Sequence, residues 1–494
     1  MNITISSSKM LAQKADAVIV FSYEDEALLK ATKKQLAELI PASSVVIQSD
    51  DFKGSLKSTI VLYTGVKTMP KVIVAGLGKK SNATIESLRK AASAASKRAA
   101  AYQAQHIAIE CIATDGASAD DCSLALMEGA MLSNYAFDKY ITANKGKKKI
   151  NKITMFSESK VLVNASKSVL NQAHAIYEGV NLARNLANAP NNEMYPEMLA
   201  KAAQNAAKGT GIKVTILDKK KIQSLKMGGL LAVNQGSVRP PVFIIMEYKG
   251  GKATDKPIVF VGKGVTFDTG GISIKPAAGM SEMKGDMHGA ASAIGAITAI
   301  AKAKLPVNVV TLVPATENMP SGTAFVPGDI VTFMNGKTAE IDNTDAEGRL
   351  ILADALTYAD KYKPKAVIDL ATLTGACVVA LGSITTGLMG NNDGLKDRIK
   401  KSSAYTNEYV CELPLYEEYE DLIKSDVADV KNSGGRMAGT ITAALFLKKF
   451  IGDYPWAHLD IAGTGLAPSE RDYWPKGGTG IGVRLLMDVA KNWK

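Results

Sequence analysis

The chain of 494 residues has little cysteine and little histidine, and each scarcity excludes a class of protein. Its four cysteines form no CxxC pair, which argues against a disulfide framework and a cysteine-based structural zinc site and favours a reducing compartment. The four histidines include no HExxH motif and no pair at ligand spacing, so a histidine-based single-zinc protease is excluded. The histidines are His106, His174, His288 and His458.

Long apolar runs are also missing. No run approaches the roughly 18 residues of a membrane-spanning helix. Residues 1–16 lack the basic and apolar regions of a secretory signal. These features predict a soluble, cytoplasmic protein that makes no membrane contact.

The composition that is present is globular, with 46% apolar and 22% charged residues. The length predicts two domains. We expect an N-terminal α/β domain at 1–160, a connecting helix at 161–190 and a larger C-terminal domain at 191–494. The net charge of +11 permits an acidic partner, but the densest lysine runs, at 145–149 and 219–221, are short and typical of solvated loops.

The pattern of apolar residues predicts an α/β fold. In the first part, β-branched runs predict strands at 17–21, 45–48, 59–63, 72–75, 107–109 and 153–156, with a helix at 86–104. A long helix is expected at 165–186. The second part predicts strands at 242–246, 258–261, 307–313, 366–370 and 458–461, and helices at 289–303, 349–361 and 440–450. We therefore expect a central mixed sheet flanked by helices in the C-terminal domain.

A polar turn, Asn343-Thr-Asp-Ala-Glu-Gly-Arg349, runs directly into an apolar-periodic helix. Asp345 and Glu347 lie at the N-terminus of this helix, where the helix dipole favours anions. The simpler interpretation is a capped helix start with Arg349 as a salt-bridge partner.

A second polar segment follows the predicted strand at 258–261. It carries Lys263, Asp268, Lys275 and Asp286 among closely spaced glycines. In open α/β sheets, ligands bind beyond the carboxyl ends of strands, which is where these residues fall. Charged side chains are poor core material, because burying an unpaired charge is costly. The alternative is a set of ordinary surface ion pairs.

The two segments together suggest a metal site. If Asp268, Asp286, Asp345 and Glu347 converge, their carboxylates cannot all stay ionised without cations. Two divalent metals would relieve this repulsion, turn a bound water into a nucleophile and polarise a carbonyl, and a neutral lysine amine can also serve as a ligand. For His288, a packed position at a helix start is favoured over a role behind the metal ligands.

The segment 259–289 and the sequence Asn343-Thr-Asp-Ala-Glu-Gly-Arg-Leu350 resemble the signature regions of the leucyl aminopeptidase (cytosol aminopeptidase) family. The similarity extends from about Ala183 to the C-terminus. It includes the segments Thr316–Gly322, Asp369–Gly375, Trp456–Gly463 and Thr479–Arg484. The family also has a variable N-terminal α/β domain.

The resemblance implies roles for individual residues. One metal site would use Asp268, Asp345 and Glu347, and the other Lys263, Asp268, Asp286 and Glu347. Lys275 would hydrogen-bond the substrate carbonyl, and Arg349 would hold a bicarbonate ion as general base. The residues implied in substrate binding are Met283, Thr372, Leu373 and Gly375.

The resemblance further implies an enzyme that releases N-terminal residues, leucine and other apolar ones preferred, from peptides. Two divalent ions, Mn²⁺ or Zn²⁺, and a homo-hexamer are expected. A two-metal phosphoesterase is a weaker alternative. Such an enzyme would need a cluster of arginines or a P-loop to bind phosphate, and this site offers only Lys275 and Arg349. DNA binding, which some bacterial members of the family show, is an alternative additional role that the positive charge permits.

Overall fold

The computed structural model describes residues 1–25, 28, 30–47, 52–144 and 148–493. Contacts divide the chain into two compact units, Met1–Tyr177 with Ser469–Pro475, and Glu178–Pro468 with Lys476–Lys494. The division at residue 177 falls inside helix α5 (Lys160–Asn188). Among the described residues, no helix combines the length and the hydropathy needed to cross a membrane.

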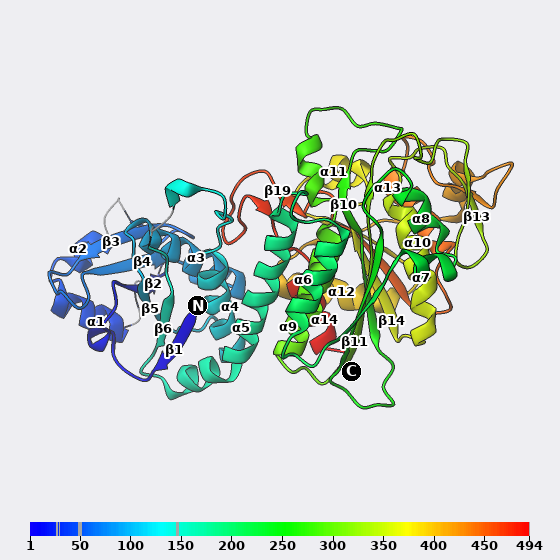
Figure 1. Cartoon of the computed structure of the whole chain (residues 1–494). Coiled ribbons are helices and arrows are strands. Elements are labelled where there is room, and N and C mark those ends of the chain that lie inside the picture. Colours follow the sequence, from blue (N-terminus) through cyan, green and yellow to red (C-terminus); the bar gives the residue numbers. More distant parts are fainter. Residues whose placement is uncertain (26–27, 29, 48–51, 145–147, 494) are drawn as a thin grey trace. The chain divides into compact units, whose positions relative to one another are not determined.

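The first unit is built on a mostly parallel sheet (Figure 1). The strand order is β1-β6-β5-β2-β4-β3, and only β3 pairs antiparallel to its neighbour. The strands are β1 (Asn2–Ser6), β2 (Ala17–Ser22), β3 (Thr59–Tyr63), β4 (Lys71–Gly76), β5 (His106–Glu110) and β6 (Lys152–Phe156). The helices besides α5 are α1 (Lys30–Leu39), α2 (Ser43–Ile47), α3 (Ile85–Ala101) and α4 (Ala119–Leu132).

One predicted strand of this unit was wrong. Residues 43–47 form helix α2, where the sequence had predicted a strand at 45–48; Gln48 itself lies outside the described residues. A short β-branched run fits a buried helix turn as well as a strand, because periodicity cannot separate the two over so few residues. The lysine run at 145–149 also falls partly outside the described residues.

Residues Ser469–Pro475 belong to the first unit, although the sequence predicts them to lie in the C-terminal domain at 191–494. Tyr473 is 1% exposed, and its hydroxyl donates to the carboxylate of Glu86 at 3.2 Å. Lys57 forms an ion pair with Asp472 at 3.1 Å. This packing depends on residues distant in sequence, so no local pattern could indicate it.

The second unit contains a mixed sheet with helices on both faces (Figure 1). Its order is β16-β15-β18-β14-β9-β11-β8-β7, with β10 beside β11. The strands are β7 (Lys213–Leu217), β8 (Val242–Lys249), β9 (Ile258–Gly262), β10 (Gly264–Asp268), β11 (Asn308–Asn318), β14 (Ala366–Ala371), β15 (Thr386–Gly390), β16 (Val410–Glu412) and β18 (Trp456–Asp460). Smaller sheets combine β12 (Ile330–Thr332), β13 (Thr338–Glu340) and β17 (Val430–Lys431), and β19 (Leu466–Ala467) with β20 (Gly477–Gly478).

Two groups of helices cover this sheet. Helix α9 contacts β9, β14 and α14, whereas α10 contacts β9, α8 and α13. The helices are α6 (Pro196–Ala207), α7 (Lys219–Ser224), α8 (Gly228–Asn234), α9 (His288–Lys302), α10 (Gly348–Ala359), α11 (Gly375–Leu381), α12 (Asp393–Thr406), α13 (Gly439–Lys448) and α14 (Val483–Lys491). The predicted α/β fold with a mixed sheet flanked by helices is confirmed.

Candidate active site

The charged residues singled out in the sequence gather at the carboxyl ends of parallel strands. Strands β11, β9, β14 and β18 are neighbours and run parallel, and β10 is parallel to β11. Lys263 follows β9, Asp268 ends β10 and Thr372 follows β14. Because these ends share one edge of the sheet, residues distant in the chain meet there.

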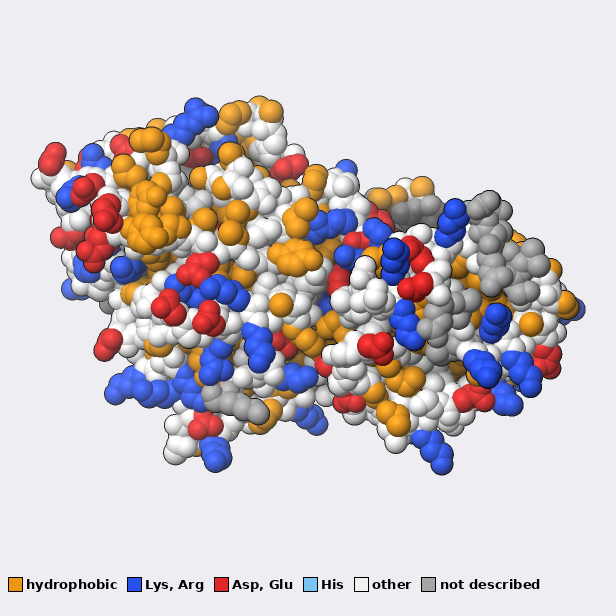
Figure 2. Space-filling model, turned by 180° about the vertical axis from the view of Figure 1, so that it is seen from behind, with side chains coloured by type: hydrophobic (Ala, Val, Ile, Leu, Met, Phe, Trp, Pro, Cys, Tyr) orange, Lys and Arg blue, Asp and Glu red, His pale blue; other side chains and the backbone are white. Residues whose placement is uncertain are grey.

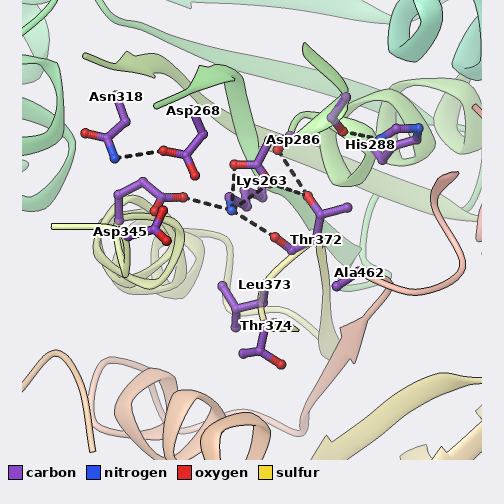
Figure 3. Close-up of polar contacts among 12 residues, drawn as sticks. Lys263, Asp268, Asp286, His288, Asn318, Asp345, Thr372, Leu373, Thr374 and Ala462 are labelled. Atoms are coloured by element: carbon purple, nitrogen blue, oxygen red, sulfur yellow. Dashed lines mark hydrogen bonds and ion pairs between the residues drawn. The ribbon is translucent and has the colours of Figure 1, made fainter. Parts of the chain in front are cut away.

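Lys263 lies at the centre of the site (Figure 3). Its ammonium nitrogen is 2.9 Å from Asp286 Oδ1 and 2.9 Å from Glu347 Oε1, and it donates to the Thr372 carbonyl oxygen at 2.8 Å. Burial alone would lower the pKa of Lys263, but the charges of Asp286 and Glu347 outweigh it and raise that pKa. A Cβ at Gly348 would stand 2.6 Å from Lys263 Cε, so any other residue at the start of α10 would require the lysine side chain to shift.

Lys275 forms the second cationic contact of the cluster. Its ammonium nitrogen is 2.9 Å from Asp268 Oδ2 and also contacts Asp345 Oδ1. Burial works against its charge, yet Asp268 and Glu347 raise the pKa of Lys275 overall. Both lysines are therefore held protonated by surrounding carboxylates.

The four carboxylates outnumber these two ammonium groups. Burial, followed by repulsion from Glu347, raises the pKa of Asp345, and burial likewise raises the pKa of Asp286 well above its ordinary value. Asp286 Oδ2, Asp345 Oδ1 and Glu347 Oε1 are buried without a directed hydrogen bond, and their close contacts are ion pairs with the two lysines. The site thus lacks positive charge.

The donor set fits divalent cations. Ligand oxygens from Asp268, Asp286 and Glu347 lie within 4.8 Å of one another, and all three residues are buried. Carboxylate oxygens suit Mn²⁺, and a carboxylate set can also hold Zn²⁺. Asp345 lies at the edge of this group with its side chain 31% exposed.

The turn before α10 differs from a side-chain-capped helix start. Glu347 occupies the N-cap position with helical dihedrals, and no side chain caps the helix. The turn is fixed by Asn343, whose Oδ1 accepts from the Asp345 N–H at 2.8 Å, and by Asn432, which donates to the Asn343 carbonyl at 2.7 Å. Glu347 is therefore free to point at Lys263.

Arg349 lies in the first turn of α10 and is not among the residues that line the cleft. It is 8% exposed, and Nη1 donates to the Asn432 carbonyl oxygen at 2.6 Å. Nε has no hydrogen-bond partner in the described part of the chain. Burial lowers the pKa of Arg349 to about 10 despite the charges of Glu347 and Asp460. Arg349 is charged at neutral pH and keeps one N–H group unpaired.

A cleft of about 430 Å³ opens over the carboxylates. The residues predicted to bind substrate all line it: Met283, Thr372, Leu373 and Gly375. His288 also lines it and begins α9; its Nδ1 contacts the Gly285 carbonyl, and burial lowers its pKa to about 4. A packed, neutral histidine at a helix start is what the structure describes.

Two buried residues of the site were not assigned roles from the sequence. Asn318 ends β11 and donates to Asp268 Oδ1 at 2.9 Å. Asp460 ends β18 and accepts from Thr374 Oγ1 at 2.6 Å and from Leu373 N at 3.2 Å, which fixes the cleft-lining loop. Both lie in segments that resemble the family, but only their contacts reveal what they hold.

Comparisons with family models cover most of the chain. The model of the cytosol aminopeptidase family, catalytic domain, matches residues 181–487. The model of the same family's N-terminal domain matches residues 19–144.

Individual relatives match over nearly their whole length. A probable cytosol aminopeptidase from Chlorobaculum parvum is 45% identical, with 100% of both chains covered, and one from Geobacter sp. (strain M21) is 44% identical, with 99% of this chain and 100% of the other covered. Among solved structures, a tomato leucine aminopeptidase mutant has a TM-score of 0.88 at 32% identity, covering 99% of this chain and 96% of its own. The bottromycin maturation enzyme BotP in complex with Mn has a TM-score of 0.85 at 32% identity, covering 97% of this chain and 99% of its own.

Proposed function

Because this chain belongs to the cytosol aminopeptidase family and is a metal-dependent aminopeptidase, we propose that it releases leucine and other apolar residues from the N-termini of peptides. The observation that carries the proposal is the convergence of Lys263, Asp268, Asp286 and Glu347 beneath a cleft of about 430 Å³. The thioether of Met283 at the cleft wall suits an apolar substrate side chain.

Two divalent ions, Mn²⁺ or Zn²⁺, would be held by five residues. Asp268, Asp345 and Glu347 would form one site. Lys263, Asp268, Asp286 and Glu347 would form the other, with Asp268 and Glu347 shared. Lys263 would serve there as the neutral amine, because a nearby dication lowers the pKa of its ammonium group. The contacts of the two ammonium groups with these oxygens mark where positive charge is needed. When bound, the metals supply an activated water and a Lewis acid, and a bicarbonate ion supplies a general base.

Lys275 is the side chain of the protein that would act on the substrate carbonyl. Its ammonium group reaches into the cleft, where it would donate to the substrate carbonyl oxygen and stabilise the negative charge that develops on it. The charges of Asp268 and Glu347 keep Lys275 protonated for this role.

Arg349 would hold the bicarbonate. Its support is the unpaired Nε and the positive charge retained beside the start of α10. A guanidinium group next to helical N–H groups is a recurrent anion site. Thr372, Leu373 and Gly375 would line the substrate position, held there by the bonds from the 372–375 loop to Asp286 and Asp460.

The assembly we propose is a homo-hexamer, as in the family, and the names of the relatives support a cytosolic location. DNA binding rests on the net charge of +11 alone. Figure 2 shows Lys and Arg side chains dispersed among acidic ones on the visible face, which does not favour it. A gel shift at low salt with the Glu347→Gln protein tests DNA binding. Absence of a retarded band would contradict it.

Hydrolysis of leucine p-nitroanilide tests the proposed activity. The protein is assayed after chelation and after addition of Mn²⁺ or Zn²⁺ to the chelated sample. We expect activity to disappear with chelator and return with metal. Absence of hydrolysis with every metal would contradict the proposal.

A further inference from the structure

Asn318 is a fully buried polar residue between the two segments that carry the carboxylates. It ends β11 and is 0% exposed. In the ladder between β10 and β11 it lies directly opposite Asp268. Most buried polar groups are hydrogen-bonded, so the partners of a fully buried amide indicate what it holds in place.

The amide nitrogen of Asn318 donates to both segments. It is 2.9 Å from Asp268 Oδ1 and 3.0 Å from the Thr344 carbonyl oxygen (Figure 3 shows the first contact). Because both partners can only accept, the orientation of the amide is fixed. Its Oδ1 has no hydrogen-bond partner within the described chain and lies so close to Gly271 that a Cβ there would be 2.8 Å away.

These hydrogen bonds decide which oxygen of Asp268 is available to contact a cation. Oδ1 accepts from Asn318 and, at 2.8 Å, from the Gly270 N–H. Oδ2 instead faces Lys275 at 2.9 Å. Two neutral donors occupy Oδ1, which leaves Oδ2 as the oxygen turned toward cationic partners.

The same amide helps to join the ligand-bearing segments. Thr344, next to Asp345, also donates through Oγ1 to the Gly270 carbonyl at 2.6 Å and accepts from the Ser273 N–H at 2.8 Å. Asn318 adds a contact from a third element, β11, to this junction. Asp268 and the turn with Asp345 and Glu347 are thus held in one arrangement by contacts between segments.

We propose that Asn318 is a positioning residue for the metal site: it orients the Asp268 carboxylate and fixes the turn at residues 343–349 against it. The inference rests on the metal-dependent function proposed above. Loss of such a partner behind a ligand typically weakens metal binding about 10–100-fold.

The test compares Asn318→Leu with Asn308→Leu, using Mn²⁺ titration of metal-free protein by calorimetry. Leucine keeps the branching at Cγ but cannot donate a hydrogen bond. Asn308, at the other end of β11, is a matched control: it is 8% exposed and donates to the carbonyls of Lys252 and Asp255 at 2.7 and 2.8 Å, far along the strand from the carboxylates. We expect Asn318→Leu to bind Mn²⁺ about 10–100-fold more weakly and Asn308→Leu to bind it as the unchanged protein does.

Thermal melting checks that each variant is folded, and Asn318→Ala, which also lacks a side-chain donor, serves if the leucine variant is not. Unchanged Mn²⁺ affinity in a folded Asn318 variant would overturn the inference, as would an equal loss in the Asn308 control. If the unchanged protein itself binds no Mn²⁺ and no Zn²⁺, the proposed function fails instead. The two failures are therefore distinguishable.

Discussion

The ammonium nitrogen of Lys263 lies 2.9 Å from Glu347 Oε1, so the residue after β9 and the residue before α10 meet beneath the cleft. The same nitrogen is 2.8 Å from Asp286 Oδ2. One lysine thus contacts carboxylates from two distant segments. Substitutions among these residues should change metal binding and catalysis together.

Glu347→Gln should abolish peptidase activity and lower metal content. Glu347 is 1% exposed and is the carboxylate proposed to serve both metals, and an amide is a poorer ligand than a carboxylate. We expect metal affinity to fall by more than the about 10–100-fold that is typical when a residue hydrogen-bonded to a metal ligand is replaced. Elemental analysis after dialysis measures it. Retention of two metals per chain would contradict the shared role.

Arg349→Ala should reduce turnover by about 10²–10⁴-fold, the contribution of a general base, while leaving metal content unchanged. The reason is that Arg349 would hold the anion and not the metals. Arg349 also donates to the Asn432 carbonyl, so Arg349→Lys is the control that keeps a cation there. Kinetics and metal analysis on the same sample separate the roles, and loss of metal would show that Arg349 is structural.

Lys275→Met should lower kcat by about 10²–10³-fold, because the developing charge on the carbonyl oxygen loses its donor. Steady-state kinetics with leucine p-nitroanilide measure this change. Lys275 also pairs with Asp268 and Asp345, so metal content is compared in parallel. A rise in KM at constant kcat would mean that Lys275 contributes only to substrate binding.

Asp354 should make stability depend on pH. It is 0% exposed and accepts the N–H groups of Leu230 at 3.0 Å and Met334 at 2.9 Å, yet burial raises its pKa from 3.8 to about 7. The unfolded chain releases this proton more readily, so the free energy of unfolding falls as the pH rises from about 4 to about 7. The fall is about 1.4 kcal/mol for each pH unit crossed between the pKa of the unfolded chain and that of the folded chain.

Asp354→Asn should remove this part of the pH dependence. The variant loses one acceptor for a buried N–H, which costs about 1–3 kcal/mol at every pH. Denaturant unfolding at several pH values compares the two proteins. An equally steep decline in the variant would assign the effect to another group, such as Glu110, whose pKa burial also raises to about 7.

Light scattering should find six copies of the chain in the active protein. The expectation comes from the family to which the chain belongs. Light scattering and activity are measured on the same dilution series, which tests whether loss of the hexamer is accompanied by loss of activity. A fully active monomer would overturn the proposed assembly.

Several local features could be predicted from the sequence because their causes are local. The β-branched runs at 17–21 and 258–261 lie in strands β2 and β9, and the Ala-rich run at 289–303 lies mostly in helix α9. The exception is the predicted strand at 45–48, whose described residues 45–47 lie in helix α2: a run this short fits one helix turn as readily as one strand. The placement of Ser469–Pro475 in the first unit rests on contacts with residues distant in sequence, such as that of Tyr473 with Glu86.

The sequence by itself determined which residues could carry the chemistry: Asp345 and Glu347 before a helix, and Lys263, Asp268 and Asp286 around a strand end. Only the tertiary structure decided how these groups meet. It turned Glu347 toward Lys263 without a side-chain cap on α10, buried Arg349 against the Asn432 carbonyl, and set Asn318 against Asp268. The physical reason is that strand pairing brings the ends of β9, β10 and β11 together, and no pattern along the chain encodes distances across a sheet.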